Sequence, residues 1–196
     1  AQYDMQLLEN YLPDKNLFHS KTHTLNVSRN AEMIGSVSSL SEHEMNILRT
    51  GALFHDTGYI KSAENHEAES SAIAREFLVA NHVDDQDIRT VSYSILATRV
   101  PQNPGDKISG ILCDADLMHL TSDDYFEQME LLRLEWQKTG RYNLTVQQFH
   151  LNSIDFFSRH RYHSDYGKEV MEPKKELTLS RIRERCADQQ HSDYHS

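Results

Sequence analysis

A histidine and an aspartate stand side by side, as His55 and Asp56, where an apolar stretch runs into the glycine Gly58. Imidazole and carboxylate groups both bind divalent metal ions. Burying such ionisable groups costs free energy unless they are paired, hydrogen-bonded or bound to a metal. The pair therefore requires partners from other parts of the chain, and metal binding is the chemistry that these two residue types favour.

Apolar residues recur at helical spacing along most of the chain, whereas no segment alternates as a β-strand would. Ser41 and Glu44 form an S-x-x-E capping box that starts a helix, and Gly58 and Gly140 are helix-stop signals. The predicted helices cover residues 5–12, 22–37, 41–56, 65–80, 85–100, 108–120, 122–138, 145–160 and 174–186. Apart from the short helix over residues 5–12, these segments make up the predicted all-α bundle of about seven or eight helices, in one domain over residues 1–196.

Further polar residues fall on the apolar faces of the predicted helices. His23 lies four residues before Val27, at the start of its helix, and so points toward the core. Asp114 and Asp116 both belong to the apolar helix over residues 108–120. Side chains two residues apart on a helix diverge by about 200°, so only one of these aspartates can face the same ion. The helical geometry alone leaves the choice between them open.

Four sequence blocks resemble, in order, the HD-domain superfamily of metal-dependent phosphohydrolases. They are Phe18-His19-Ser20-Lys21-Thr22-His23-Thr24, Phe54-His55-Asp56-Thr57-Gly58-Tyr59, Asn65-His66-Glu67 and Ile111-Leu112-Cys113-Asp114-Ala115-Asp116-Leu117. These blocks look like the family's Y-H-N-x-x-H-T, HD, N-H-E and D-A-D-L motifs. The resemblance implies a metal-site core over about residues 18–120. A helical extension over about residues 121–190 is similar to the C-terminal part of a bacterial subgroup of HD hydrolases.

The resemblance implies one divalent metal ion, or two, held by His23, His55, Asp56 and Asp116. Asp116 is favoured over Asp114 because the family's recurring A-D-x-L matches the stretch that begins at Ala115. Mixed nitrogen and oxygen ligands suit Mn²⁺, Fe²⁺, Co²⁺, Ni²⁺, Zn²⁺ or Mg²⁺. The branch of the family that acts on cyclic dinucleotides carries a lysine where this chain has Tyr59. The resemblance therefore does not imply hydrolysis of cyclic dinucleotides.

Phosphoester hydrolysis at neutral pH is the reaction that such a site would support. A bound ion lowers the pKa of a water from about 15.7 to about 7 and neutralises charge on the phosphoryl group. We therefore expect a phosphatase or phosphodiesterase that uses metal-activated water on a small phosphorylated substrate such as a nucleotide. The candidates to relay a proton are His19, His66 and Glu67. The candidates to hold the phosphate are Lys21, Lys61 and Arg99.

Two other functions stay open at this point. Some proteins that resemble HD hydrolases use the same ligand frame for O₂ chemistry, so a di-iron oxygenase with His66 at the second iron is one alternative. A non-catalytic regulator stabilised by a metal is the other. The apolar stripe of Tyr125, Met129, Leu132 and Trp136 is expected to pack in the core rather than to form a cofactor site. The histidines expected to pack or to face solvent are His119, His160 and His163.

The overall charge argues against a nucleic-acid partner. The chain has 20 Lys and Arg against 30 Asp and Glu, a formal net charge of −10, which would repel a phosphate backbone. Cys113 and Cys186 match neither a zinc spacing nor a disulfide framework, and no apolar run is long enough for a signal peptide or a membrane span. We therefore expect a cytoplasmic protein with no membrane partner, and a homodimer stays open.

Overall fold

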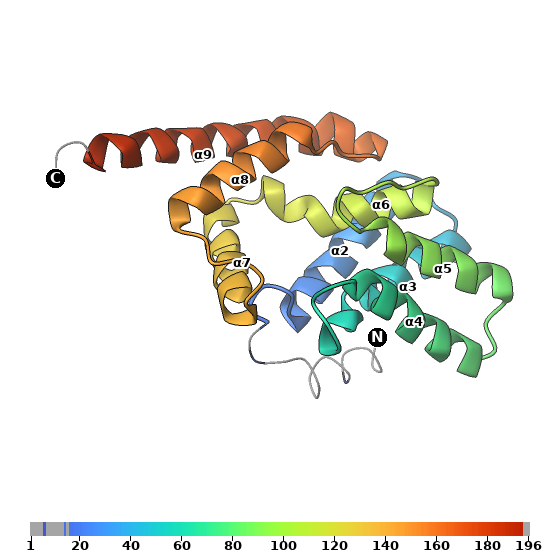
Figure 1. The fold of residues 1–196 in the computed structure, drawn as a ribbon. Helices are drawn as coiled ribbons and strands as arrows, with labels where there is room; N and C mark the ends of the chain where they lie inside the picture. The colour runs from blue at the N-terminus through green and yellow to red at the C-terminus, as the bar shows by residue number, and fades with distance from the viewer. Residues whose placement is uncertain (1–5, 7–13, 15, 194–196) are drawn as a thin grey trace.

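The computed structural model describes residues 6, 14 and 16–193, and these residues contain no strand. The all-α prediction is confirmed (Figure 1). Apart from residue 6, the predicted helix over residues 5–12 lies outside the described residues. The α-helices of the described part are α2 (Lys21–Val37), α3 (Glu42–Phe54), α4 (His66–Ala80), α5 (Asp85–Ala97), α6 (Lys107–Asp116), α7 (Tyr125–Thr139), α8 (Val146–Arg159) and α9 (Glu172–Asp193). Between them lie the 3₁₀ turns η1 (Thr57–Ile60) and η2 (Leu117–Thr121) and the π-helical turn η3 (Gly167–Met171).

Local capping sets several helix ends. The Ser41 hydroxyl accepts a hydrogen bond from Glu44 N at 3.3 Å, and the Glu44 carboxylate accepts one from Ser41 N at 2.8 Å, as the capping box predicts. Thr145 and Gln148 make the same reciprocal pair at the start of α8. Gly140 ends α7 with a φ of 73°, a left-handed conformation that glycine adopts without a Cβ clash.

Several helix ends differ from the prediction. Helix α5 stops at Ala97 rather than at residue 100, because Pro101 lacks an N–H and disfavours helical backbone in the residue before it. Helix α6 stops at Asp116 and continues as the tighter turn η2 instead of running to residue 120. Helix α9 begins at Glu172, two residues ahead of the predicted start. The change in α6 matters most, because it lies beside one of the predicted metal ligands.

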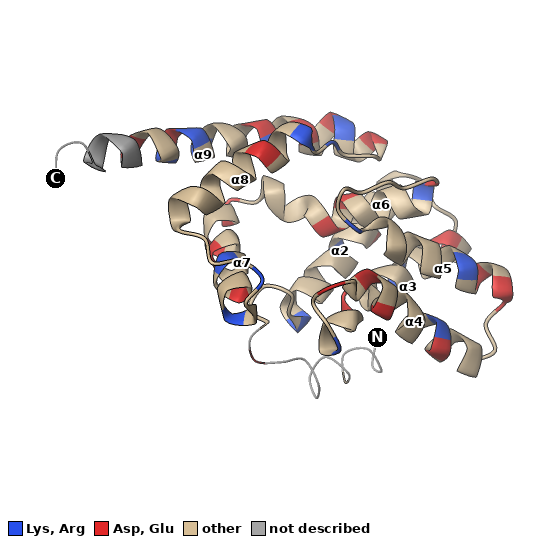
Figure 2. Cartoon of the chain, in the orientation of Figure 1, with Lys and Arg blue, Asp and Glu red and all other residues tan. Residues whose placement is uncertain are grey.

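Helices α2, α3, α5 and α6 form the centre of the bundle (Figure 1). Their most buried apolar side chains, each at most 1% exposed, are Val27, Ala31, Ile34, Leu48, Ala52, Ile95, Ile111 and Leu112. Helices α7, α8 and α9 lie on the other side of the molecule, with α8 packed along α9. Figure 2 shows basic and acidic residues mixed along α9. Within the described part of the chain, no helix combines the length and the apolar character needed to cross a membrane.

Asp114 fastens the loop between α8 and η3 to the centre of the bundle. Its fully buried carboxylate accepts hydrogen bonds from the backbone N–H groups of His163 and Ser164, both at 2.8 Å, and from the Ser164 hydroxyl at 2.5 Å. This contact joins residues 49 and 50 positions apart in the sequence. The three donors occupy the carboxylate of Asp114, which leaves Asp116 as the aspartate of α6 that faces the other way.

We expect Asp114→Ala to lower the free energy of unfolding by about 2–4 kcal/mol, because two backbone N–H groups would stay buried without an acceptor. Urea denaturation followed by circular dichroism measures this. Asp165→Ala removes an exposed carboxylate from the same loop and is the matched control. The control should change stability by less than about 0.5 kcal/mol. Equal stability of the two variants would contradict the fastening role of Asp114.

Candidate metal centre

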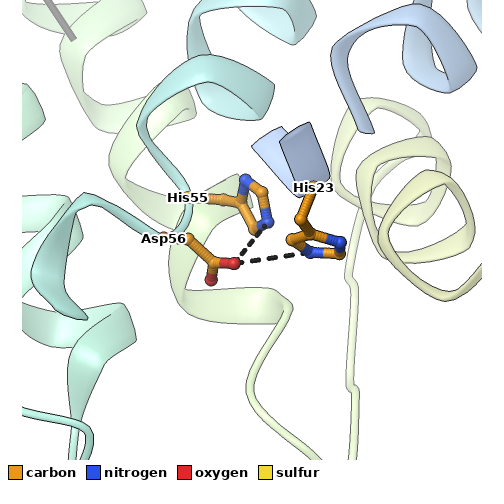
Figure 3. A group of neighbouring side chains, drawn as sticks. All are labelled: His23, His55 and Asp56. Carbon is orange, nitrogen blue, oxygen red and sulfur yellow. Dashed lines mark ion pairs between the residues drawn. The ribbon is translucent and has the colours of Figure 1, made fainter. Parts of the chain in front are cut away.

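The end of α3 turns the His55–Asp56 pair into two converging ligands. His55 still has helical backbone angles, whereas Asp56 leaves the helix with φ −109° and ψ 3°. The Asp56 carboxylate therefore turns back toward the ring, and its Oδ2 lies 3.2 Å from His55 Nε2 (Figure 3). On a continuous helix the two side chains would be separated by about 100°. The break in the helix at Asp56 thus brings together two side chains that a continuous helix would hold apart.

Gly58 allows α4 to approach this turn closely. A Cβ atom at this position would lie 2.1 Å from the backbone oxygen of His66, which is a distance that no side chain tolerates. The Gly58 N–H also donates to the Ser70 hydroxyl at 2.8 Å. The glycine of the HD block is therefore required by the packing of α4, and that packing carries His66 to the site.

His23 and Asp116 complete a cluster of four side chains. His23 lies in the first turn of α2, and its Nε2 is 3.4 Å from Asp56 Oδ2 and 3.2 Å from Asp116 Oδ1. The same Asp116 oxygen lies 3.6 Å from His55 Nε2. His23, His55 and Asp56 are buried and offer ligand atoms that all lie within 4.8 Å of one another (Figure 3). The structure thus brings together all four residues that the sequence predicts as metal ligands.

The ring of His55 is oriented as a metal ligand requires. Its Nδ1 lies 2.8 Å from the backbone oxygen of Ala52, so a neutral ring donates there and leaves the Nε2 lone pair directed at Asp56. His55 Nε2 and Asp56 Oδ2 are both buried, and neither has a hydrogen-bond partner among the described residues. Two unsatisfied buried acceptors that face each other at 3.2 Å would repel unless a cation lay between them. These residues therefore fit a divalent ion.

The pKa shifts at the cluster also favour a bound cation. Burial raises the pKa of Asp56 and of Asp116, but the neighbouring imidazoles outweigh burial and hold both values well below the ordinary range. Burial lowers the pKa of His55, while the carboxylates of Asp56 and Asp116 more than offset it and hold this pKa well above the usual value. The carboxylates of Asp56 and Asp116 are thus ionised in a buried environment and need a nearby positive charge. Either a proton on His55 or a metal ion supplies that charge.

A second group of potential metal-binding side chains lies on the other side of Asp56. His66 is the first residue of α4, and its Nε2 lies 3.7 Å from Asp56 Oδ1 and 3.5 Å from Glu67 Oε1. The Nδ1 of His66 lies 3.2 Å from the backbone oxygen of Ala63, so this ring also directs its Nε2 at the carboxylate. The two oxygens of Asp56 therefore face two different sets of residues, and the second set could hold a second ion.

His19 is held by a carboxylate from a distant helix. Its Nδ1 lies 2.5 Å from Glu135 Oε1, and its Nε2 lies 3.0 Å from the Tyr59 hydroxyl. Glu135 is only 2% exposed, and its other oxygen accepts from the backbone N–H groups of Phe18 at 2.9 Å and His19 at 3.0 Å. Burial lowers the pKa of His19, but the Glu135 hydrogen bond and the charges of nearby carboxylates together outweigh it, and the net shift is upward. The ring centroid of Tyr59 lies 4.1 Å from that of His19 and 4.2 Å from that of His66, and the ring stacks against both.

Sequence reasoning missed Glu135, because its partners lie 116 and 117 positions away. The available signal was a carboxylate beside the apolar stripe of α7, three residues after Leu132. His119 also lies nearer the site than expected. It lines the cavity described below, and burial, followed by the neighbouring His23, lowers its pKa to about 4.

The predicted phosphate-holding residues are placed differently from one another. Lys61 pairs with Glu69 at 2.9 Å on the surface, and neither Lys61 nor Lys21 lines the cavity beside the cluster. Arg99 does line that cavity and donates to Asn65 Oδ1 at 2.9 Å. Arg141 lines it too, and sequence reasoning missed this residue. No described carboxylate pairs with Arg141, whose guanidinium lies 5.8 Å from the ring of Trp136.

A cavity of about 670 Å³ opens beside the cluster, between the α7–α8 side and the centre of the bundle. Asp56, His66, Glu67, Asp116 and His19 line one end of it. The stripe that we expected to pack in the core, Tyr125, Met129, Leu132 and Trp136, lines another part. Packing in the core is confirmed, because Tyr125 and Met129 belong to the hydrophobic core and Leu132 and Trp136 pack against it. Helical periodicity indicates only that a face avoids bulk water. It does not tell whether side chains or a cavity cover the face.

An all-α bundle with a buried cluster of imidazoles and carboxylates defines a helical protein with a candidate metal centre. The family model of the HD domain matches residues 21–186. The chain therefore belongs to the HD-domain superfamily of metal-dependent phosphohydrolases, as its motifs predicted. The match includes all four residues of the cluster and also α7 and α8. No curated protein matches the chain.

We expect Mn²⁺ to raise the melting temperature, because an ion at about 100 times its Kd adds about 2.7 kcal/mol of stability, or about 5–10 °C for a chain of this size. Differential scanning fluorimetry with and without the ion measures the shift. Asp56→Asn removes one charge from the cluster and should abolish the shift. Asp123→Asn removes an exposed carboxylate and should keep it. A full shift in Asp56→Asn would contradict the assignment of the centre.

Proposed function

We propose that this protein is a hydrolase that cleaves a small phosphoester, with a nucleotide as the favoured substrate and Mn²⁺ as the favoured ion. The observation that carries the proposal is the convergence of His23, His55, Asp56 and Asp116 at one end of a substrate-sized cavity. The ligand atoms of His55 and Asp56 are buried there without hydrogen-bond partners. Membership of the HD family supports the same reaction class.

The metal would be held by these four residues, and His66 with Glu67 would hold a second ion if two bind. When bound, a divalent ion lowers the pKa of a water and neutralises charge on the phosphoryl group. In hydrolysis the water oxygen forms a bond to phosphorus while the bond from phosphorus to the leaving oxygen breaks. The leaving oxygen then needs a proton, and the ordered residues beside the cluster must supply it.

Of the residues beside the cluster, His19 has the most firmly fixed side chain and is our candidate to donate that proton. Glu135 fixes the ring through Nδ1, so that the proton on Nε2 points toward Tyr59 and the cavity. The carboxylate also stabilises the charged ring before transfer, and it keeps the ring in one orientation afterwards. Glu135 therefore acts as a positioning residue for His19. Tyr59 packs against the ring and limits its rotation.

Two guanidinium groups suit an anionic substrate. Arg99 follows α5, and Arg141 follows α7, so the two reach the cavity from different sides of the molecule. Arginine donates in pairs to phosphate oxygens. This charge favours the hydrolase over the di-iron oxygenase and over the non-catalytic regulator, neither of which needs cations there. We therefore propose Arg99 and Arg141 as the phosphate contacts, ahead of Lys21 and Lys61.

We expect Asp56→Ala to lower phosphate release by at least about a hundredfold, because the loss of a ligand should cost no less than the loss of an outer-shell partner. The assay is a screen of Mn²⁺, Mg²⁺, Co²⁺ and Ni²⁺ against nucleoside mono-, di-, tri- and cyclic phosphates. Asp123→Ala is the matched control and should keep full activity. Wild-type activity in a folded Asp56→Ala variant would refute the hydrolase.

We expect Glu135→Gln to slow the cleavage of an alkyl phosphate by about 10–100-fold and His19→Asn to slow it by about 10²–10⁴-fold. Both variants should have much smaller effects on p-nitrophenyl phosphate. The reason is that an alkoxide needs a proton when it leaves, whereas p-nitrophenolate does not. Steady-state kinetics on both esters, with metal content measured in parallel, tests this. A merely structural role for Glu135 would slow both esters by the same factor.

A further inference from the structure

Beyond the metal centre, the cavity continues along α7 and α8 as an apolar surface. We define the apolar arm as Leu132, Trp136, Phe149 and Phe156, which all line this part of the cavity. The rings of Trp136 and Phe149 lie 5.4 Å apart at an angle of 57°, so they form one continuous wall. Leu132, Trp136 and Phe156 are only partly buried, so part of their apolar surface is in contact with water in the cavity, which is unfavourable.

The size of the cavity exceeds what a phosphate needs. Sites for drug-sized ligands measure about 300–1,000 Å³, and this cavity of about 670 Å³ lies within that range. The metal cluster and the two arginines account for the polar contacts of a phosphoryl group. They leave the apolar arm to the organic group of the substrate.

Charge is distributed unevenly along the cavity. Its acidic lining residues, Asp56, Glu64, Glu67 and Asp116, belong to the turns and helix ends around the metal cluster. None of the described residues of the apolar arm is charged, and Arg141 marks its edge by contact with Trp136. The arm thus suits a neutral, apolar group that is connected to an anionic one.

We propose that the substrate is a phosphoester whose organic group is large and apolar or aromatic, and that this group binds in the apolar arm. The inference rests on the proposed function, because it places the phosphoryl group at the metal centre. An aromatic ring such as a nucleobase and a long alkyl chain share this chemistry. Both would remove apolar surface of α7 and α8 from water.

Trp136 makes the proposal measurable without turnover. It is the only tryptophan of the chain, so intrinsic fluorescence reports on the arm directly. The ligands are phosphonates, whose carbon–phosphorus bond is not hydrolysed: methyl-, benzyl- and decylphosphonate and a nucleoside phosphonate, each titrated into the Mn²⁺-loaded protein. We expect at least one of the larger ligands to bind about tenfold more tightly than methylphosphonate and to shift the emission, since two buried methylene groups suffice for such a gain.

The ranking of the larger ligands identifies the source of the apolar group. Tightest binding of decylphosphonate supports an alkyl chain, and tightest binding of the benzyl or nucleoside ligand supports an aromatic ring. Equal dissociation constants for all four ligands, with no change in the emission of Trp136, would overturn the proposal. This series uses the wild-type protein and therefore does not depend on the folding of a variant.

Two adjacent leucines provide a matched pair of variants. Leu132 lines the cavity, whereas Leu131 is 43% exposed and does not line it. We expect Leu132→Ala to weaken the tightest apolar phosphonate by about tenfold and inorganic phosphate by less than twofold. Leu131→Ala should leave both dissociation constants unchanged. Equal effects of the two variants would count against the arm as the binding surface.

Failure of this inference and failure of the proposed function give different results. If apolar phosphonates bind and shift Trp136 emission while no phosphoester is cleaved, the arm is a binding site and the hydrolase proposal is wrong. If methyl phosphate is cleaved with the same kcat/KM as benzyl and decyl phosphates, which have similar leaving groups, the hydrolase stands and the apolar arm plays no part in substrate choice.

Discussion

The buried carboxylate of Asp56 is the group on which the centre of this molecule depends. One of its oxygens faces His23 and His55, and the other faces His66, so it touches side chains from three helices or their ends. An ionised carboxylate in the interior is costly unless positive charge or hydrogen-bond donors surround it. The packing of α2, α3 and α4 against one another is therefore tied to the charge state of a single side chain.

The cluster is built almost entirely from helix ends. His23 lies in the first turn of α2, His55 caps the end of α3, His66 begins α4, and Asp116 ends α6. The last carbonyl groups of a helix have no partner within that helix. Such carbonyls orient two rings here, because Ala52 O accepts from His55 and Asp116 O accepts from His119. Backbone carbonyls at helix ends thus take the place of additional side chains in fixing these two imidazoles.

Local features of the site could be predicted from the sequence. The capping box at Ser41, the stop at Gly140 and the inward position of His23 each depend on residues a few positions apart, which is the range that helical periodicity covers. The preference for Asp116 over Asp114 came from the family motif, and the packing of Asp114 against Ser164 gives it a physical cause.

Features that depend on distant contacts could not be predicted in this way. Glu135 meets His19 across 116 positions, and nothing in either neighbourhood indicates that contact. Arg141 is an exposed residue after a helix stop, a place where arginines commonly face solvent. The stripe on α7 showed the correct periodicity, but whether it faces a protein core or a ligand depends on how far α7 lies from the rest of the bundle.

Helix α7 supplies both the carboxylate that holds His19 and the wall on which the organic group would rest. Because an α-helix is rigid and rises about 1.5 Å per residue, the level of Glu135 is separated from that of Leu132 by about 4.5 Å and from that of Met129 by about 9 Å. These separations cannot change without bending the helix. In the proposed reaction, helix α7 would therefore hold each part of the apolar wall at a fixed distance from His19, and the rigid helix would set the length of organic group that fits beside the proton donor.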